Sequence, residues 1–342
     1  MGVVAHGGRS VRDPKDRKGG QADLPWAPYV WAMKAETRSF YEAAVERAAH
    51  RVIVMLDDAL DLELLAREAA LSPFHFHRVF RGMIGETPLE LHRRLRLERA
   101  AMQLRQSSQS ITAIAFSAGY ETHEAFTRAF RSAYGCAPST FRSPPSVDAE
   151  STHRRTTSQS IQLAARSGIH YSADGRRPTI VFARGGVSMQ VSIEQLPSLR
   201  VACVRHVGPY LEIGQAFGRL GAIAEGSSAF AAPDTLMLAI FHDDPESVAP
   251  SQLQSDAGLT IAEGVPLPDG LQETRITAGR YARATHQGPY EGLNDAWSRL
   301  MGEWLPSSGH RVGEGRGFEV YRNTPMTAAP EALLTDLYLP IA

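Results

Sequence analysis

The sequence predicts a multi-domain chain in which an all-α part is followed by an α+β part. The length of 342 residues suits about two domains of ordinary size. Residues 143–160 are rich in proline, serine and threonine and contain almost nothing to bury, so they indicate a linker. Each side of that linker contains an internal repeat, and the two repeats are of different kinds.

These observations divide the chain into four segments. Residues 1–36 are rich in glycine, proline and charge and lack the continuous apolar stretch of a signal peptide, so we expect a disordered leader. An all-α domain is predicted at residues 37–143 and an α+β domain at residues 189–342. Residues 144–188 are predicted to be the linker between them.

The formal net charge of −1 conceals an asymmetry between the two parts of the chain. The first 188 residues carry a net charge of +7, and the last 154 carry −8. We therefore expect different partners for the two parts, and the acidic part provides a favourable field for cations.

Cysteine content and short motifs exclude several classes of protein. Two cysteines, Cys136 and Cys203, cannot form a disulfide framework or a four-ligand zinc site. No run approaches the roughly 18 apolar residues of a membrane span. Walker-type loops, nucleophile elbows and H-E-x-x-H motifs are missing from the sequence. We expect a cytoplasmic protein with no cofactor, no metal and no catalytic residues.

The all-α part contains the same unit twice. Residues 65–88 (LAREAALSPFHFHRVFRGMIGETP) return as residues 114–138 (IAFSAGYETHEAFTRAFRSAYGCAP), at an offset of 49 before a turn and 50 after it. Apolar residues recur at helical spacing, and Ser72 followed by Pro73 is typical of a helix N-terminus. Each copy predicts a helix-turn-helix, whose second helix can enter the major groove of DNA.

A long helix predicted at residues 89–106 joins the two copies. A rigid connector of this kind would hold the two second helices at a fixed separation. If that separation is near one turn of DNA, about 34 Å, both helices can bind successive major-groove segments without a dimer.

The α+β part repeats at a constant offset of 80 residues. HVGPY at 206–210 returns as HQGPY at 286–290, and LAIFHDDP at 238–245 aligns with FEVYRNTP at 318–325. We expect strand, helix, strand and strand in each copy, with the helices on one side of an antiparallel sheet. Strands are predicted at residues 200–207, 236–241, 259–265, 280–286, 318–321 and 334–340.

The two copies of the α+β unit differ at positions that a binding site would use. Copy one has Ala239 and Phe217 where copy two has Glu319 and Trp297. Copy two therefore places a carboxylate among aromatic side chains, which suits an organic cation through charge pairing and cation–π contact. The alternative is that Glu319 is exposed or paired with an arginine and that the tryptophans are core residues.

Residues 40–142 resemble the DNA-binding domain of AraC/XylS-type transcriptional regulators, most specifically in GYETHEAFTRAFRSAYGCAPSTFR and ALSPFHFHRVFRGMIGETPLE. The resemblance implies that the second helix of each copy reads DNA. Arginine suits this role because it pairs bidentately with guanine or binds phosphate. The candidate DNA-binding residues are Phe74, His77, Arg78 and Arg81 in copy one and His123, Glu124, Thr127, Arg128 and Arg131 in copy two.

Residues 189–342 resemble the GyrI-like effector-binding domain, in both H-x-G-P-Y segments, in FEVYRNTP and in the terminal TDLYLPI. The resemblance implies a small-molecule cleft between the two copies, faced by the glutamate of the FEVY strand. The candidate effector-binding residues are Glu319, Tyr321, Trp297, Trp304, Phe241 and Tyr290.

Together these features predict a sequence-specific transcriptional regulator. Its expected partners are double-stranded promoter DNA, RNA polymerase and a small cationic or aromatic effector, with no membrane. Two alternatives stay open for the α+β part: a hydrolase with Glu319 as general base, or a module that binds a protein such as a gyrase-like partner.

Overall fold

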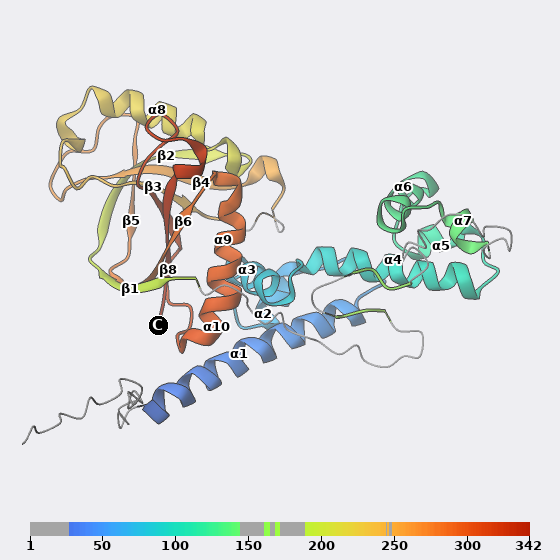
Figure 1. The fold of residues 1–342 in the computed structure, drawn as a ribbon. Coiled ribbons are helices and arrows are strands. Elements are labelled where there is room, and N and C mark those ends of the chain that lie inside the picture. Colours follow the sequence, from blue (N-terminus) through green and yellow to red (C-terminus); the bar gives the residue numbers. More distant parts are fainter. Residues whose placement is uncertain (1–26, 144–160, 165–167, 172–188, 244, 246–247) are drawn as a thin grey trace, which may run out of the picture.

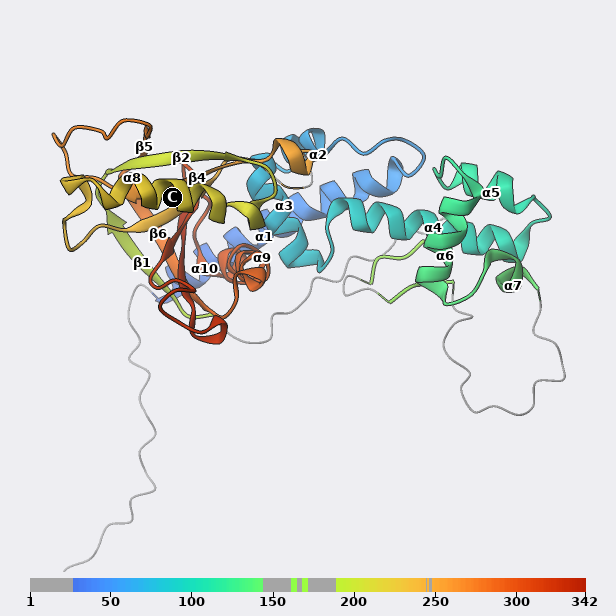
Figure 2. The ribbon, with the colours of Figure 1, turned by 90° about the horizontal axis from the view of Figure 1, so that it is seen from above.

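The computed structural model describes residues 27–143, 161–164, 168–171, 189–243, 245 and 248–342. A helical N-terminal part lies against a C-terminal sheet and its covering helices (Figure 1). One long helix carries the far end of the helical part away from the sheet, as a second view shows (Figure 2). The two ends of the helical part therefore have different surroundings.

The N-terminal part contains the two predicted helix-turn-helix units. The helices are α1 (Ala27–Val54), α2 (Leu62–Glu68), α3 (Pro73–Ile84), α4 (Pro88–Gln106), α5 (Ile111–Ser117), α6 (His123–Tyr134) and α7 (Pro138–Arg142). The first unit is α2–α3, the second is α5–α6, and α4 is the connector, about 28 Å long. Ser72 and Thr122 cap α3 and α6, which both end at a glycine in the left-handed conformation.

The predicted leader is too long by ten residues. Helix α1 begins at Ala27, so residues 27–36 are helical, whereas residues 1–26 lie outside the described part of the chain. The helix packs against the C-terminal part: the Arg311 guanidinium lies 4.4 Å from the ring centre of Phe40, and the Tyr41 hydroxyl accepts a hydrogen bond from the Val312 backbone N–H. Long-range packing of this kind cannot be seen in local composition.

The C-terminal part is an eight-stranded antiparallel sheet in the order β1-β6-β8-β7-β3-β4-β2-β5. The strands are β1 (Val191–Leu196), β2 (Leu199–Val207), β3 (Met237–Phe241), β4 (Gln254–Thr260), β5 (Gln272–Ile276), β6 (Gly279–Gln287), β7 (Phe318–Tyr321) and β8 (Leu334–Pro340). The helices are α8 (Gly214–Glu225) after β2, and α9 (Leu293–Arg299), a π-helical turn η5 (Leu300–Trp304) and α10 (Leu305–Ser308) after β6. The duplicated α+β architecture is confirmed.

The strand predictions need two corrections. Strand β4 begins and ends five residues earlier than predicted, because the acidic Asp256 is buried there, where Arg205 and His242 bind its carboxylate. Strands β1 and β5 were missed, because most of their side chains are at least partly exposed and leave a weak apolar pattern. Each of these strands pairs with the other copy, β1 with β6 and β5 with β2, so the two copies are tied together.

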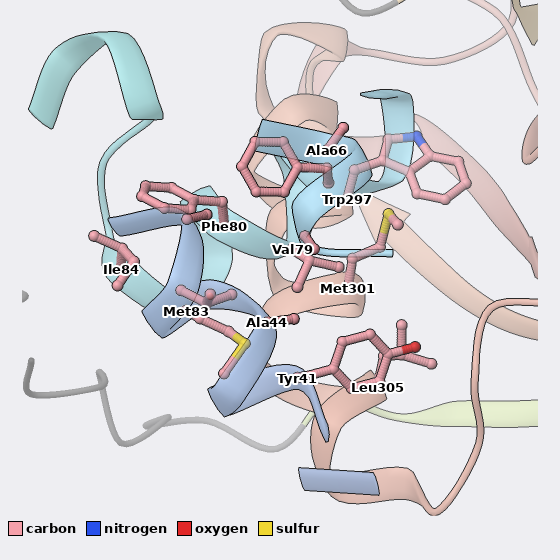
Figure 3. Close-up of a cluster of buried hydrophobic side chains, with 14 of the residues drawn as sticks. Tyr41, Ala44, Ala66, Val79, Phe80, Met83, Ile84, Trp297, Met301 and Leu305 are labelled. Atoms are coloured by element: carbon pink, nitrogen blue, oxygen red, sulfur yellow. The ribbon is translucent and has the colours of Figure 1, made fainter. Parts of the chain in front are cut away.

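The first helix-turn-helix unit and the sheet share one hydrophobic core, which we call the shared core. Side chains of α1–α4 pack there with those of α9, η5, α10 and β8. Figure 3 labels ten of its members: Tyr41, Ala44, Ala66, Val79, Phe80, Met83, Ile84, Trp297, Met301 and Leu305. The second unit has a separate core built around Phe126 and Phe130. The two predicted domains are therefore packed against each other through this shared core.

Part of the predicted linker is docked on the connector helix. Glu98 of α4 is fully buried, and its carboxylate accepts hydrogen bonds of 2.8 Å from the backbone N–H groups of Leu163 and Tyr171. Ile169 between them is also fully buried. Residues 161–164 and 168–171 therefore belong to the packed structure, and the rest of 144–188 lies outside the described residues.

Candidate functional site

The second helix-turn-helix unit presents its predicted reading residues outward. Phe126 and Phe130 of α6 are fully buried, so the opposite side of this amphipathic helix is free. All five residues predicted to contact DNA are at least partly exposed: His123, Glu124, Thr127, Arg128 and Arg131. An exposed helical face with two arginines can enter a major groove and bind guanine edges or phosphates.

The first unit turns the same face toward α9 and η5 of the C-terminal part. His77 and Arg78 of α3 are each only 6% exposed. The Arg78 guanidinium carbon lies 3.8 Å from the ring centre of Phe74 and 5.5 Å from that of Trp297 in α9. Arg81 forms a 3.2 Å ion pair with Asp295, also from α9. The predicted reading face of α3 is therefore covered, and its DNA contacts stay a prediction.

Two glycines permit this close approach. A Cβ atom at Gly82 of α3 would overlap the Ser298 carbonyl oxygen and lie 2.5 Å from Gly302 Cα, and one at Gly302 would overlap the backbone of Gly82. The position equivalent to Gly82 in α6 is Ser132, which is exposed. The contact lies at the π-helical turn η5, whereas residues 220–224 of α8, its counterparts in copy one, are regular α-helix.

Glu319 lies in β7 at the junction of the two copies, where β7 pairs with β3. It is 3% exposed. One carboxylate oxygen accepts a 2.7 Å hydrogen bond from the indole N–H of Trp297, and the other accepts a 2.9 Å hydrogen bond from the Tyr321 hydroxyl. These two predicted effector residues are thus brought together with Glu319.

Aromatic rings from both copies extend this cluster. The Tyr321 ring lies 5.4 Å from Tyr290 and 5.5 Å from Phe217 of α8, measured between ring centroids. Phe217 was not predicted to bind effector, although it is the copy-one counterpart of Trp297, and that equivalence could have identified it. We call Glu319, Trp297, Tyr321, Tyr290 and Phe217 the aromatic carboxylate site.

Two predicted effector residues lie in other contacts. Phe241 packs edge-on against Tyr210, with ring centroids 4.8 Å apart. Trp304 stacks on His310, with ring centroids 6.3 Å apart, and borders the shared core. Because the structure gives both residues other partners, any role for them in effector binding stays a prediction.

Burial dominates the electrostatics of the aromatic carboxylate site. It raises the pKa of Glu319, while the hydrogen bonds from Trp297 and Tyr321 and the charge of Arg78 act in the opposite direction. Burial also raises the pKa of Tyr321 well above its ordinary value. A cation placed against Glu319 would stabilise the ionised carboxylate and would favour release of a proton.

Comparison with known proteins identifies both parts. Residues 189–342 match the GyrI-like small molecule binding domain, and residues 65–143 match a helix-turn-helix domain. The chain is 34% identical over 136 residues to a DNA gyrase inhibitor of Yersinia enterocolitica, a match that covers 38% of this chain and 84% of the relative.

Further relatives carry regulator names. The probable transcriptional regulator YgiV of Escherichia coli is 31% identical over 103 residues, which cover 29% of this chain and 63% of YgiV. The HTH-type transcriptional regulator Rv1931c of Mycobacterium tuberculosis is 40% identical over 78 residues, which cover 23% of this chain and 30% of Rv1931c.

The fold and these matches define a helix-turn-helix DNA-binding protein fused to a small-molecule-binding α+β domain, which is the architecture of a transcriptional regulator. The chain belongs to the GyrI-like family. Both resemblances predicted from the sequence are confirmed. None of the helices in the described residues is long and apolar enough to cross a bilayer.

Proposed function

We propose that this regulator binds promoter DNA through α3 and α6 and binds a small organic cation at the aromatic carboxylate site. The observation that carries the proposal is the buried carboxylate of Glu319, which accepts hydrogen bonds from Trp297 and Tyr321 and is surrounded by aromatic side chains. It occurs in a chain that also has two helix-turn-helix units. RNA polymerase is the proposed protein partner, and the proposed place of action is the cytoplasm.

The DNA claim is tested with a fragment from upstream of the chain's own gene. In a gel-shift titration at near-physiological salt, we expect binding at least about 1,000-fold tighter than to random DNA. Arg128→Ala should weaken it, because Arg128 is exposed on α6, whereas Arg316→Ala removes an exposed arginine of the sheet part and should not. Equal binding to both DNAs would contradict the claim.

The effector claim is tested with benzyltrimethylammonium and its neutral carbon isostere, neopentylbenzene. Glu319→Gln keeps the shape and a hydrogen-bond acceptor for Trp297 but removes the charge, so it should weaken the cation about tenfold and the isostere little. Glu314→Gln removes an exposed charge five residues earlier in the chain and is the matched control. Equal losses for both probes would contradict charge pairing.

The pH dependence gives a second readout for Glu319. Burial raises the pKa of Glu319, so the neutral acid persists to higher pH in the free protein than for an exposed glutamate, whereas a bound cation favours the carboxylate. The affinity for benzyltrimethylammonium should therefore rise with pH, and Glu319→Gln should flatten that rise. A pH-independent affinity in the wild-type chain would contradict the assignment.

The geometry favours a receptor over the two alternatives. Glu319 is held by a tryptophan and by Tyr321, and burial raises the pKa of Tyr321 well above its ordinary value, so its hydroxyl is a weak nucleophile and the pair makes weak hydrolytic chemistry. A small ligand that enters between the two copies can reach a residue that is 3% exposed more readily than a protein surface can. Turnover of p-nitrophenyl acetate that is lost in Glu319→Ala would contradict the proposal.

A further inference from the structure

We infer that α3 has two mutually exclusive positions and that Arg78 changes partner between them. In the docked position, which the structure shows, Arg78 lies on the aromatic carboxylate site of the C-terminal part. In the released position, Arg78 and its neighbours contact DNA. The inference rests on the proposed function and adds a mechanism: an organic cation competes with Arg78 and releases α3.

Docked α3 cannot enter a major groove. A reading helix must bring its outer side chains within hydrogen-bond distance of base edges. In α3 that face holds His77 and Arg78, both 6% exposed, and Gly82, whose backbone touches that of Gly302. DNA and the α9–η5 segment would occupy the same space, so only one can contact α3 at a time.

Arg78 takes the place that a cationic effector would need. Its guanidinium carbon lies 3.8 Å from the ring centre of Phe74 and 5.5 Å from that of Trp297, and its charge opposes the rise in the pKa of Glu319. A positive group against aromatic rings beside a carboxylate is the combination by which proteins bind organic cations. The chain thus supplies an internal cation to its own effector site.

A cation bound at Glu319 would weaken the docked position in two ways. It would compete for the carboxylate that holds the indole of Trp297, the ring on which Arg78 rests. It would also place a second positive charge near the guanidinium, and the repulsion is strong in a buried site. A neutral ligand lacks that repulsion and favours release less, because a ligand shifts an equilibrium only by its differential affinity.

The internal repeat supports docking as a specific feature of copy one. Copy two keeps the arginine at the equivalent position, Arg128, but has exposed Ser132 where copy one has Gly82. A helix-turn-helix therefore folds with a side chain at that position, and glycine is needed only where another backbone approaches.

The test uses the full chain with Gly302→Ala, which blocks docking from outside the DNA-binding part. Wild-type protein should protect one major-groove segment of the upstream fragment, and the variant should extend the footprint by about 10 base pairs. The variant adds the contacts of α3 to those of α6, so it should also bind tighter, by a few-fold, as expected for about 1 kcal/mol from one added arginine contact. Gly82→Ala should reproduce both effects, and Ser132→Ala, the matched control, should change neither.

Hydrogen exchange of α3 tests docking without DNA. Exchange should be faster in both glycine variants, and benzyltrimethylammonium should accelerate it in the wild-type chain while neopentylbenzene does not. A melting curve shows that each variant is folded. A wild-type footprint that already spans both segments, or α3 exchange unchanged in both glycine variants, would overturn the inference.

Failure of the proposed DNA function and failure of the proposed competition at Arg78 give different results. If every chain leaves DNA unprotected while α3 exchange responds as expected, the proposed DNA function is wrong and docking stands. If the glycine variants lengthen the footprint but the cation has no effect, the DNA function and docking stand, and competition between effector and Arg78 is wrong.

Discussion

The two helix-turn-helix units follow one sequence pattern but have opposite surroundings. In α6 the arginine-bearing face is open, whereas in α3 it lies against α9 and η5. Both units bury the same pair of phenylalanines, Phe76 and Phe80 in one and Phe126 and Phe130 in the other. The difference comes from outward positions such as Gly82 and Ser132. A change of side chain on this one face is therefore enough to let a DNA-binding helix also pack against a second domain.

The largest expected contrast is in the cores. Phe80→Ala and Phe130→Ala each remove a fully buried ring and should each cost about 3–5 kcal/mol of stability. Phe80 belongs to the shared core, so its loss should also accelerate hydrogen exchange in β8, whereas Phe130→Ala should affect α5–α7 and the C-terminal half of α4, whose side chains belong to the same core. Equal exchange of β8 in the two variants would show that the cores are not separate.

The next contrast depends on pH. Burial, together with the charge of Arg78, lowers the pKa of His75 to about 4, against 6.5 in the unfolded chain. The unfolded chain therefore binds a proton first, so stability is full above pH 6.5 and falls by about 3 kcal/mol as the pH drops toward 4.

The variant His75→Ala isolates this contribution. Copy two has Ala125 at the equivalent position, so the variant should flatten the acid dependence of the first unit and leave that of the second unchanged. Urea unfolding of wild type and variant between pH 4 and 7 measures the difference in slope. Identical slopes would show that His75 does not titrate in this range.

A smaller contrast concerns Arg78 and Arg128, which occupy equivalent positions in the two helix-turn-helix units. In the otherwise wild-type chain, Arg128→Ala should weaken DNA binding by about 5- to 150-fold, the effect of about 1–3 kcal/mol expected for a specific arginine contact. Arg78→Ala should weaken it less, because α3 is docked. In the Gly302→Ala background the two losses should become similar. Equal losses in both backgrounds, by fluorescence anisotropy, would contradict the difference between the units.

The smallest contrast is electrostatic. Asp295→Arg replaces an ion pair with Arg81 by a repulsion, at a side chain that is 76% exposed. Exposed pairs contribute about 0.2–1 kcal/mol, so DNA affinity should rise by about 1.5- to 5-fold and the gain should shrink at high salt. Glu291→Arg makes the same charge change at an exposed site in the preceding turn and should leave affinity unaltered. A salt-independent gain would point to another cause.

Local pattern and resemblance predicted most of the fold and four of the five residues that the structure brings together in the aromatic carboxylate site, whose role in binding stays a prediction. Repeats identified both helix-turn-helix units and both α+β copies, and the difference between Ala239 and Glu319 identified the carboxylate. The docking of α3 was missed, because Arg81 and Asp295 are 214 residues apart and no local pattern links them.

An irregular helical turn explains why Trp304 does not lie beside Glu319 as Trp297 does. Seven residues after Trp297, it would face the same way in a regular α-helix, since seven residues make about two turns. The π-helical turn η5 adds a residue to the turn between them, so Trp304 rotates away from Glu319 and stacks on His310.

The contact between Gly82 and Gly302 has a consequence for reading the sequences of other regulators with these two parts. Neither position accepts a Cβ while α3 is docked, although 220 residues separate them along the chain. Glycine at both positions would therefore indicate a chain whose first DNA-binding helix can dock on the C-terminal part and be kept away from DNA. A larger residue at either position would mark a chain in which both helices are always available to DNA.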